Sequence, residues 1–331
     1  MRKCLVTGGC GFLGSWIVRQ LAESGREVRV LAVPGEARDN LAGLDVEVVE
    51  GDVRSRADVE RAVQGVDTVF HAAAIYQDWA PDPTLMYDVN LRGTFFVLEA
   101  ARRAGVERVI DTASIVSLGR PEPGSWGDEQ TPYEAWDLDF PYSRSKLFSR
   151  EIAEYFAAWD LDVRVVCPGI VLGPGDIRPT PSGRLIIGSL TTPGPALCFD
   201  GGATYVDVRD AAAVHLLAAE KGKKGERYLA TAHNLTNEEF VRTILEVSGR
   251  KRPLVNLPEG VARTVARAFE AAAKRTGKPP LLARDFFEYG LKPSFYRNDK
   301  ARRELGATFR PIEDTIRDAI EYFRDRGLLA R

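Results

Sequence analysis

The segment that decides the fold spans residues 4–14 and has the sequence CLVTGGCGFLG. Its apolar start predicts a buried strand, and a helical pattern of apolar residues begins at its end. Between the two, Gly8, Gly11 and Gly14 follow the spacing G-x-x-G-x-x-G. In such a loop the first glycine permits a tight turn, the second lets the backbone approach a pyrophosphate, and the third lets the helix pack closely on the strand. Because the glycines stand between the first strand and the first helix, the segment predicts a dinucleotide-binding loop rather than a plain turn.

Strands and helices alternate downstream of this loop. The expected strands lie near 28–33, 46–50, 68–70, 109–111 and 163–166, and the expected helices near 13–24, 57–64, 84–104 and 143–158. Such alternation with short connections is typical of βαβ units around a parallel sheet. The chain is therefore predicted to be an α/β protein with a Rossmann doubly wound parallel sheet.

The pattern changes after Pro168. Residues 172–202 are dense in Gly and Pro, residues 203–232 return briefly to strand–helix–strand, and the rest of the chain is mainly helical. We assign residues 1–171 and 203–232 to a dinucleotide-binding Rossmann domain. In this assignment, residues 172–202 and 233–331 form a smaller, mainly helical C-terminal lobe that binds the substrate.

The composition is that of an ordinary folded chain. Of its 331 residues, 44% are hydrophobic and 28% are charged, which argues against disorder and a coiled coil. The formal net charge of −2 gives no general surface for a polyanion, so we expect no nucleic-acid partner. None of the four cysteines has a metal-ligand spacing, and we expect neither disulfides nor a metal. Because no stretch is apolar enough for a membrane span or a secretory signal, we expect a cytoplasmic protein.

Tyr142 and Lys146 stand four residues apart at the start of a predicted helix, which puts them on one face. A phenol with a pKa of ~10 is a poor acid or base at neutral pH. A nearby ammonium group favours the phenolate and makes proton transfer possible. Ser114, just beyond the strand at 109–111, is the candidate for orienting a substrate oxygen. A surface Tyr–Lys pair has the same spacing, but the glycine loop, Ser114 and the pair in this order favour a reaction centre.

Further candidate positions follow other strand ends. Asp52 comes after the third strand, where its carboxylate could accept the adenine amino group or cap the next helix. His71 ends the fourth strand and is interpreted as a packed, hydrogen-bonded histidine rather than a catalyst. The small residues Ala72, Ala73 and Ala74 would let a cofactor lie flat across the strand ends.

The sequence resembles the extended (atypical) short-chain dehydrogenases/reductases, the superfamily of dihydroflavonol reductases, 3β-hydroxysteroid dehydrogenases and nucleotide-sugar epimerases. The resemblance covers nearly the whole chain and rests on motifs at 7–14, 51–53, 71–74, 89–94, 112–114, 142–146, 168–174, 205–210 and 299–306. Segments 79–83, 178–184 and 225–228 narrow it to a bacterial, dihydroflavonol-reductase-like group. That group is often labelled hopanoid-associated sugar epimerase, a label that is not an established activity.

The resemblance implies roles for individual residues. Tyr142 would be the acid/base, Lys146 the ribose anchor, Ser114 the hydrogen-bond donor to the substrate oxygen, and Asn90 a further catalytic-site residue. The implied cofactor contacts are Thr7, Gly8, Gly11, Phe12, Leu13, Gly14, Arg38, Asp52, Val53, Ala72, Ala73, Ala74, Thr112, Tyr142, Lys146, Pro168, Gly169, Ile170 and Val171. The resemblance also implies a small-molecule substrate and a homodimer.

The choice between NAD and NADP is left open by the residues after the second strand. Relatives carry an Asp for the NAD ribose or an Arg for the NADP 2′-phosphate there, whereas this chain has Ala32 and Val33. Glu36 and Arg38 lie further along the loop. Without a carboxylate at the strand end a phosphate is not repelled, so we expect a slight preference for NADP through Arg38.

Three functions fit these motifs. The first is an NAD(P)-dependent oxidoreductase that interconverts a secondary alcohol and a ketone. The second is a nucleotide-sugar epimerase that retains NAD, and the third is a cofactor-sensing protein without catalysis. A dehydratase is disfavoured, because related dehydratases carry an acidic pair after the catalytic hydroxyl and Ser114 is followed by Ile115 and Val116.

The candidate substrate contacts are Tyr76, Trp79, Ser114, Trp136 and Arg184. If the aromatic members line the cleft, the substrate has a sizeable apolar or polycyclic body. Packing between the two lobes is the alternative role for these rings. A sugar nucleotide would need cations for its diphosphate, which Arg178 and Arg184 could supply.

Overall fold

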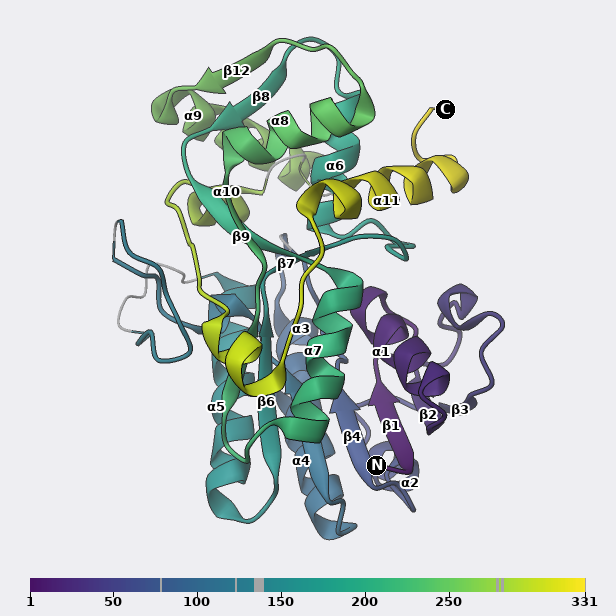
Figure 1. Cartoon of the computed structure of the whole chain (residues 1–331). Helices are drawn as coiled ribbons and strands as arrows, with labels where there is room; N and C mark the ends of the chain where they lie inside the picture. The colour runs from purple at the N-terminus through teal and green to yellow at the C-terminus, as the bar shows by residue number, and fades with distance from the viewer. Residues whose placement is uncertain (78, 123, 134–139, 278–279, 281–282, 331) are drawn as a thin grey trace.

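The computed structural model describes residues 1–330 except 78, 123, 134–139, 278–279 and 281–282. The described residues form a parallel sheet of seven strands in the order β10-β6-β5-β4-β1-β2-β3 (Figure 1). Its strands are β1 (Lys3–Thr7), β2 (Glu27–Ala32), β3 (Glu47–Glu50), β4 (Thr68–His71), β5 (Arg108–Thr112), β6 (Val163–Pro168) and β10 (Arg227–Ala230). The order reverses direction at β1, as in a doubly wound sheet.

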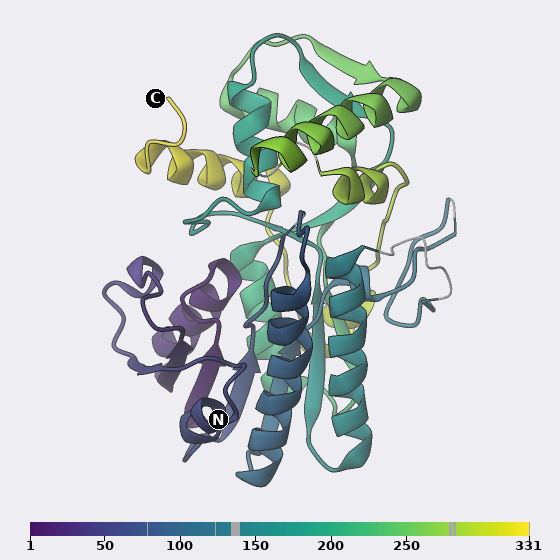
Figure 2. The same cartoon turned by 180° about the vertical axis from the view of Figure 1, so that it is seen from behind.

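Helices cover both faces of this sheet. They are α1 (Phe12–Glu23), α2 (Arg56–Ala62), α4 (Thr94–Arg103), α5 (Pro141–Trp159) and α7 (Val208–Lys221). Figure 1 shows α1 and α7 in front of the strands, and Figure 2 shows α4 and α5 on the opposite face. Two buried apolar clusters, one on each face, form the core of this part. All four residues of β4 are buried, as expected for a central strand covered on both sides.

The predicted helix over 84–104 contains a wider turn. It consists of α3 (Thr84–Tyr87), a π-helical stretch at Asp88–Gly93 and α4. The apolar periodicity does not reveal this change, because a π turn adds one residue to an otherwise continuous helix. Such turns are frequent at functional sites, and this one contains Asn90.

The C-terminal region contains short strands besides its helices. β7 (Ile170–Leu172), β9 (Gly202–Asp207) and β11 (His233–Thr236) form a small sheet, and β8 (Ala196–Phe199) pairs with β12 (Leu254–Leu257). Around them lie α6 (Pro181–Thr191), α8 (Asn237–Ser248), α9 (Glu259–Thr276), α10 (Arg284–Gly290) and α11 (Ile312–Asp325). The short helical turns at Asp39–Leu41, Ile115–Ser117 and Ala301–Leu305 complete the described elements. The predicted doubly wound parallel sheet with a smaller C-terminal region is confirmed.

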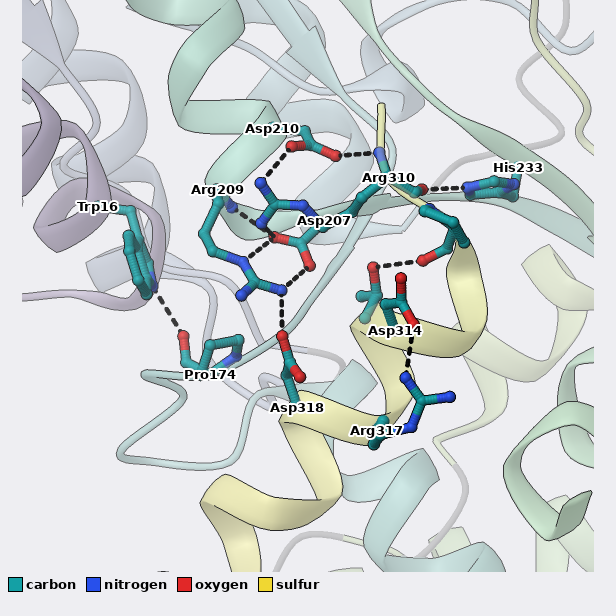
Figure 3. A network of polar contacts seen from close by, with 12 residues as sticks. Trp16, Pro174, Asp207, Arg209, Asp210, His233, Arg310, Asp314, Arg317 and Asp318 are labelled. Atoms are coloured by element: carbon teal, nitrogen blue, oxygen red, sulfur yellow. Dashed lines mark hydrogen bonds and ion pairs between the residues drawn. The ribbon is translucent and has the colours of Figure 1, made fainter. Parts of the chain in front are cut away.

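An ion-pair network fixes the C-terminal region to the large sheet (Figure 3). Asp207 caps α7 by accepting the Arg209 backbone N–H at 2.8 Å, and its side chain is 1% exposed. Arg209 pairs with Asp207 at 2.7 Å and with Asp318 on α11 at 2.6 Å. Arg310 pairs with Asp207 at 3.1 Å and with Asp210 at 3.0 Å. Because Asp207 is buried, these contacts are screened less than surface ion pairs and hold α11 against the start of α7.

Candidate functional site

A cavity of about 630 Å³ lies at the carboxyl ends of the parallel strands. Its wall includes Gly8 after β1, Val33 after β2, Ala72 after β4, Ala113 after β5 and Gly169 after β6. In open α/β sheets, ligands bind outside the carboxyl ends of the strands near the point where the strand order reverses. The cavity occupies that position.

The glycine loop has the shape that a pyrophosphate requires. Gly8 has a φ of +70°, and a Cβ there would lie 2.7 Å from the Ala73 nitrogen. A Cβ at Gly14 would lie 2.1 Å from the Gly8 oxygen. Gly11 lines the cavity, and within 4 Å its Cβ would meet only that same oxygen, at 3.2 Å. Gly11 is also the N-cap of α1 and offers no side-chain acceptor to the first-turn N–H groups. The loop therefore leaves room and donors for a phosphate.

Thr7 differs from the prediction. Its side chain is fully buried and does not line the cavity. Its hydroxyl lies 2.7 Å from His71 Nδ1 and accepts the Ala73 N–H at 3.3 Å, so it joins β1 to β4. His71 Nε2 lies 2.9 Å from the Thr94 hydroxyl, and burial lowers the pKa of this histidine to about 3. The interpretation of His71 as a packed, hydrogen-bonded histidine is confirmed.

Ser114, Tyr142 and Lys146 meet on the cavity wall. Tyr142 and Lys146 lie at the start of α5, and Ser114 follows β5. Burial raises the pKa of Tyr142, and the Ser114 hydroxyl lies close enough to the phenol to lower that pKa in part. The Lys146 Nζ donates to the Thr112 carbonyl oxygen at 2.7 Å. Burial lowers the pKa of this lysine, while the Asp111 carboxylate raises it.

Asn90 lies outside the cavity wall, although it is predicted as a catalytic residue. Its Oδ1 accepts the Ile75 N–H at 2.8 Å. Its Nδ2 donates to the Ile75 carbonyl at 3.1 Å and to the Ser145 hydroxyl at 2.9 Å. These bonds satisfy a side chain that is 1% exposed. Asn90 therefore joins the loop after β4 to α5.

Most of the other predicted cofactor contacts line the cavity. These are Phe12, Leu13, Asp52, Val53, Ala72, Ala73, Ala74, Thr112, Pro168, Gly169, Ile170 and Val171, besides the three glycines, Tyr142 and Lys146. Asp52 does not cap the helix that follows, because the Ser55 hydroxyl accepts the Asp58 N–H there. Instead Asp52 forms an ion pair with Arg54 at 2.6 Å, and the hydrogen bonds from Arg54 lower the pKa of the Asp52 carboxyl.

Arg38 is the other exception. It does not line the cavity, and its guanidinium pairs with Glu50 at 2.5 Å. Glu36, two residues earlier, does line it. The geometry therefore gives no support to an NADP contact through Arg38.

The predicted substrate contacts divide in the same way. Tyr76 lines the cavity, and its ring centre lies 4.8 Å from that of Tyr142. Trp79 is half-buried and Arg184 donates to the Pro179 carbonyl at 3.1 Å, and neither lines the cavity. Trp136 lies outside the described residues. Arg178 does line the cavity.

Several wall residues were missed by sequence reasoning. Leu85 and Val89 come from the helix after β4, Phe140 precedes α5, and Tyr289 comes from α10. The position of Phe140 immediately before the Tyr–Lys segment is a signal that could have been used. Tyr289 reaches the wall only through the packing of the C-terminal region, so no local pattern indicates it.

The described residues contain no group of three or more His, Cys, Asp or Glu side chains that could hold a metal ion. They also contain no helix with the length and apolar character needed to cross a membrane.

Comparisons with known proteins agree with this site. Residues 4–230 match the family model of the NAD dependent epimerase/dehydratase family. A Synechocystis protein provisionally named dihydroflavonol 4-reductase is 33% identical, over 99% of this chain and 96% of its own length. Sterol demethylase protein B of Methylococcus capsulatus is 33% identical, over 98% of this chain and 99% of its own length.

The solved structures give the same result. The crystal structure of a nucleoside-diphosphate-sugar epimerase from Pseudomonas aeruginosa has a TM-score of 0.81 and 28% identity to this chain, covering 99% of each. The narrower likeness to the group labelled hopanoid-associated sugar epimerase stays a prediction. With a doubly wound sheet, a glycine loop on a shared cavity and a family match over most of its length, the chain belongs to the NAD-dependent epimerase/dehydratase family and is an extended short-chain, NAD(P)-dependent oxidoreductase.

Proposed function

We propose that this protein interconverts a secondary alcohol and a ketone by hydride transfer, with Tyr142 as the acid/base and a sizeable apolar or polycyclic substrate. The observation that carries the proposal is that Ser114, Tyr142 and Lys146 lie on the wall of the same cavity as the glycine loop. One cavity can thus hold a dinucleotide and bring a substrate oxygen to a phenol.

Tyr142 is suited to give a proton to a carbonyl oxygen. The phenol is protonated at neutral pH, because its ordinary pKa is ~10 and burial raises that pKa further. A nicotinamide, when bound, supplies or accepts the hydride. The hydroxyl of Ser114 holds the substrate oxygen close to the phenol, and in the oxidative direction Tyr142 takes the alcohol proton.

Lys146 holds the cofactor ribose and favours the phenolate. An ammonium group has three N–H donors. One donates to the Thr112 carbonyl, which fixes the lysine against β5 and leaves the other two for ribose hydroxyls. The positive charge lowers the cost of removing the Tyr142 proton in the oxidative direction.

The wall around Tyr142 supports an apolar substrate. Ile75, Leu85, Val116, Phe140 and Tyr289 all line the cavity. Apolar walls with a few polar groups are typical of sites for small molecules with a hydrophobic body. The names of relatives refer to a dihydroflavonol and to sterols, and these are planar or polycyclic compounds.

A nucleotide-sugar epimerase with retained NAD is the second candidate. Arg178 on the cavity wall favours it, because a sugar nucleotide carries a diphosphate that needs a cation. The similarity to a nucleoside-diphosphate-sugar epimerase points the same way. In this alternative the nicotinamide returns its hydride to the same substrate and is not exchanged.

The substitution Tyr142→Phe tests the proposed role of the phenol. We expect turnover to fall by at least about a hundredfold, because a general acid/base is lost, while NAD(P) still binds. Steady-state rates and titration calorimetry measure the two effects. The matched control is Tyr155→Phe, a change on the same helix at a side chain that is exposed. Retention of more than about a tenth of the activity would discard the assignment.

We also propose that the protein is a homodimer that uses the outer face of α4 and α5. The aromatic side chains Phe95, Tyr155 and Trp159 on this face are 46%, 66% and 55% exposed. Exposed apolar groups gathered on one face are typical of an interaction surface. We expect dimers by sedimentation and monomers after Tyr155→Glu with Trp159→Glu. A monomeric wild-type protein at micromolar concentration would contradict this.

A further inference from the structure

We propose that Glu36 makes this protein prefer NAD to NADP, by accepting hydroxyl protons of the adenosine ribose and repelling a 2′-phosphate. This inference rests on the proposed cofactor site and names the residue that selects the cofactor there. It also reverses the preference that the sequence alone suggested.

Glu36 lies where the ribose of a dinucleotide is expected. It lines the cavity with Leu31 and Val33 at the end of β2 and with Gly11 of the glycine loop. In sheets of this kind the adenosine ribose lies over the end of the second strand, where an acidic residue binds its hydroxyls. Ala32 and Val33 offer no polar side chain at that end. Glu36 supplies the missing carboxylate from the loop that follows.

The backbone and the glycine loop hold this carboxylate. Glu36 Oε2 accepts the Val33 N–H at 3.3 Å, so the side chain folds back over the end of β2. Cys10 of the glycine loop lies close by, and burial followed by the Glu36 charge raises the pKa of its thiol to about 11. The carboxylate is thus held between β2 and the glycine loop, on the cavity wall where a ribose hydroxyl can reach it.

The cationic side chains near the end of β2 either pair with other groups or belong to another segment of the chain. Arg38 pairs with Glu50 at 2.5 Å and is off the wall. Arg54 is on the wall but pairs with Asp52 at 2.6 Å. Lys146 lies at the reaction centre, where it donates to Thr112.

Arg178 is the remaining described cation on the wall, and it belongs to the loop after β7. This loop comes near the site because Asn40 Nδ2 donates to the Gly175 carbonyl at 3.0 Å. A 2′-phosphate would therefore meet Glu36 first, and Arg178 is the cation to exclude by experiment.

Titration calorimetry with NAD and with NADP tests this on the full-length protein. We expect NAD to bind at least about tenfold more tightly than NADP, the difference made by one hydrogen bond to a charged group. Glu36→Gln should weaken NAD and bring the two affinities within about threefold of each other. Arg38→Ala and Arg178→Ala should leave the ratio unchanged. The matched control is Asp39→Asn, which removes the same charge from the same loop off the wall.

Three results would overturn the inference. They are an equal or tighter binding of NADP by the wild type, a ratio that Glu36→Gln leaves unchanged, and a selective loss of NADP affinity in Arg38→Ala or Arg178→Ala. Melting curves establish whether each variant is folded. If Glu36→Gln is not folded, Glu36→Ser replaces it in the test. Failure of the wild type to bind either nucleotide would instead refute the proposed cofactor site. If Tyr142 proved not to be the acid/base, the two nucleotide affinities would not change, so the two failures can be told apart.

Discussion

Asp111 is a buried carboxylate on β5 behind the proposed reaction centre. It is 2% exposed, and its Oδ2 has no hydrogen-bond partner among the described side chains and backbone. Burial raises its pKa to about 7, the Lys146 charge lowers it and the Glu154 charge raises it. An unpaired carboxylate is costly to bury in its charged form. The folded protein therefore holds the Asp111 proton more tightly than the unfolded chain does.

The substitution Asp111→Asn tests this pH dependence. Because the folded pKa is raised, the contribution of Asp111 to stability is complete below its ordinary value of 3.8 and declines up to about pH 7. The variant has no such decline. We expect it to melt a few degrees above the wild type at pH 8 and with little difference at pH 4. Asp160→Asn, at an exposed site after α5, is the control. Parallel melting curves across this pH range would contradict the account.

Residue-level prediction could use only signals that are local in the sequence. The order of the glycine loop, Ser114 and the Tyr–Lys pair along the sequence predicted that they share one site. The carboxyl ends of parallel strands lie at one edge of the sheet, so residues near those ends meet there. Arg38 could not be read correctly, since its capture by Glu50 depends on how two loops pack. Thr7 ends the first strand, but its side chain faces His71 rather than the cavity.

At the scale of elements, the glycine loop shows two different demands on glycine. A Cβ at Gly14 would lie 2.1 Å from a backbone oxygen within the loop itself. A Cβ at Gly11 would meet that oxygen at 3.2 Å, and Gly11 lines the cavity. Gly14 is therefore needed for the packing of α1 on β1. Gly11 leaves space for the ligand.

We expect Gly11→Val to block cofactor binding with little loss of fold. NAD(P) affinity should fall by at least about tenfold, while the melting temperature changes by a few degrees at most. Gly14→Val should unfold the domain instead. Gly260→Val, on α9 with nothing within 4 Å of its Cβ, controls for the residue type. Calorimetry and melting curves separate these outcomes, and an unchanged affinity in Gly11→Val would mean that the loop is only a turn.

Elements with strong apolar periodicity were predictable, and short ones were not. Most strands of the large sheet have buried apolar runs long enough to read, although β3 has none. The π-helical stretch at Asp88–Gly93 lacks such a signal because one extra residue hardly changes the apolar pattern of a helix. The short strands β7 and β11 lack it because their partner strand β9 is distant in sequence. Tyr289 was hidden for the same reason, since it reaches the cavity through the packing of α10.

At the scale of the whole molecule, the ion-pair network around Asp207 joins the two parts that share the cavity. Arg209 and Arg310 link the start of α7, in the large sheet's helical layer, to α11 and the chain before it. The wall accordingly combines residues of the glycine loop with Tyr289 and Arg178. A cavity built from both parts can hold a cofactor on one side and a sizeable substrate on the other.

Counting cofactor turnover against product tests the central claim most directly. Purified protein is given NADH or NADPH with a panel of apolar ketones, and the nicotinamide absorbance is followed while the alcohol is quantified. The account predicts that nicotinamide is oxidised in equimolar amount with the alcohol formed, and that denatured protein releases little bound NAD. An equimolar amount of NAD released on denaturation, with a sugar nucleotide isomerised and the external cofactor unchanged, would contradict it and favour the epimerase.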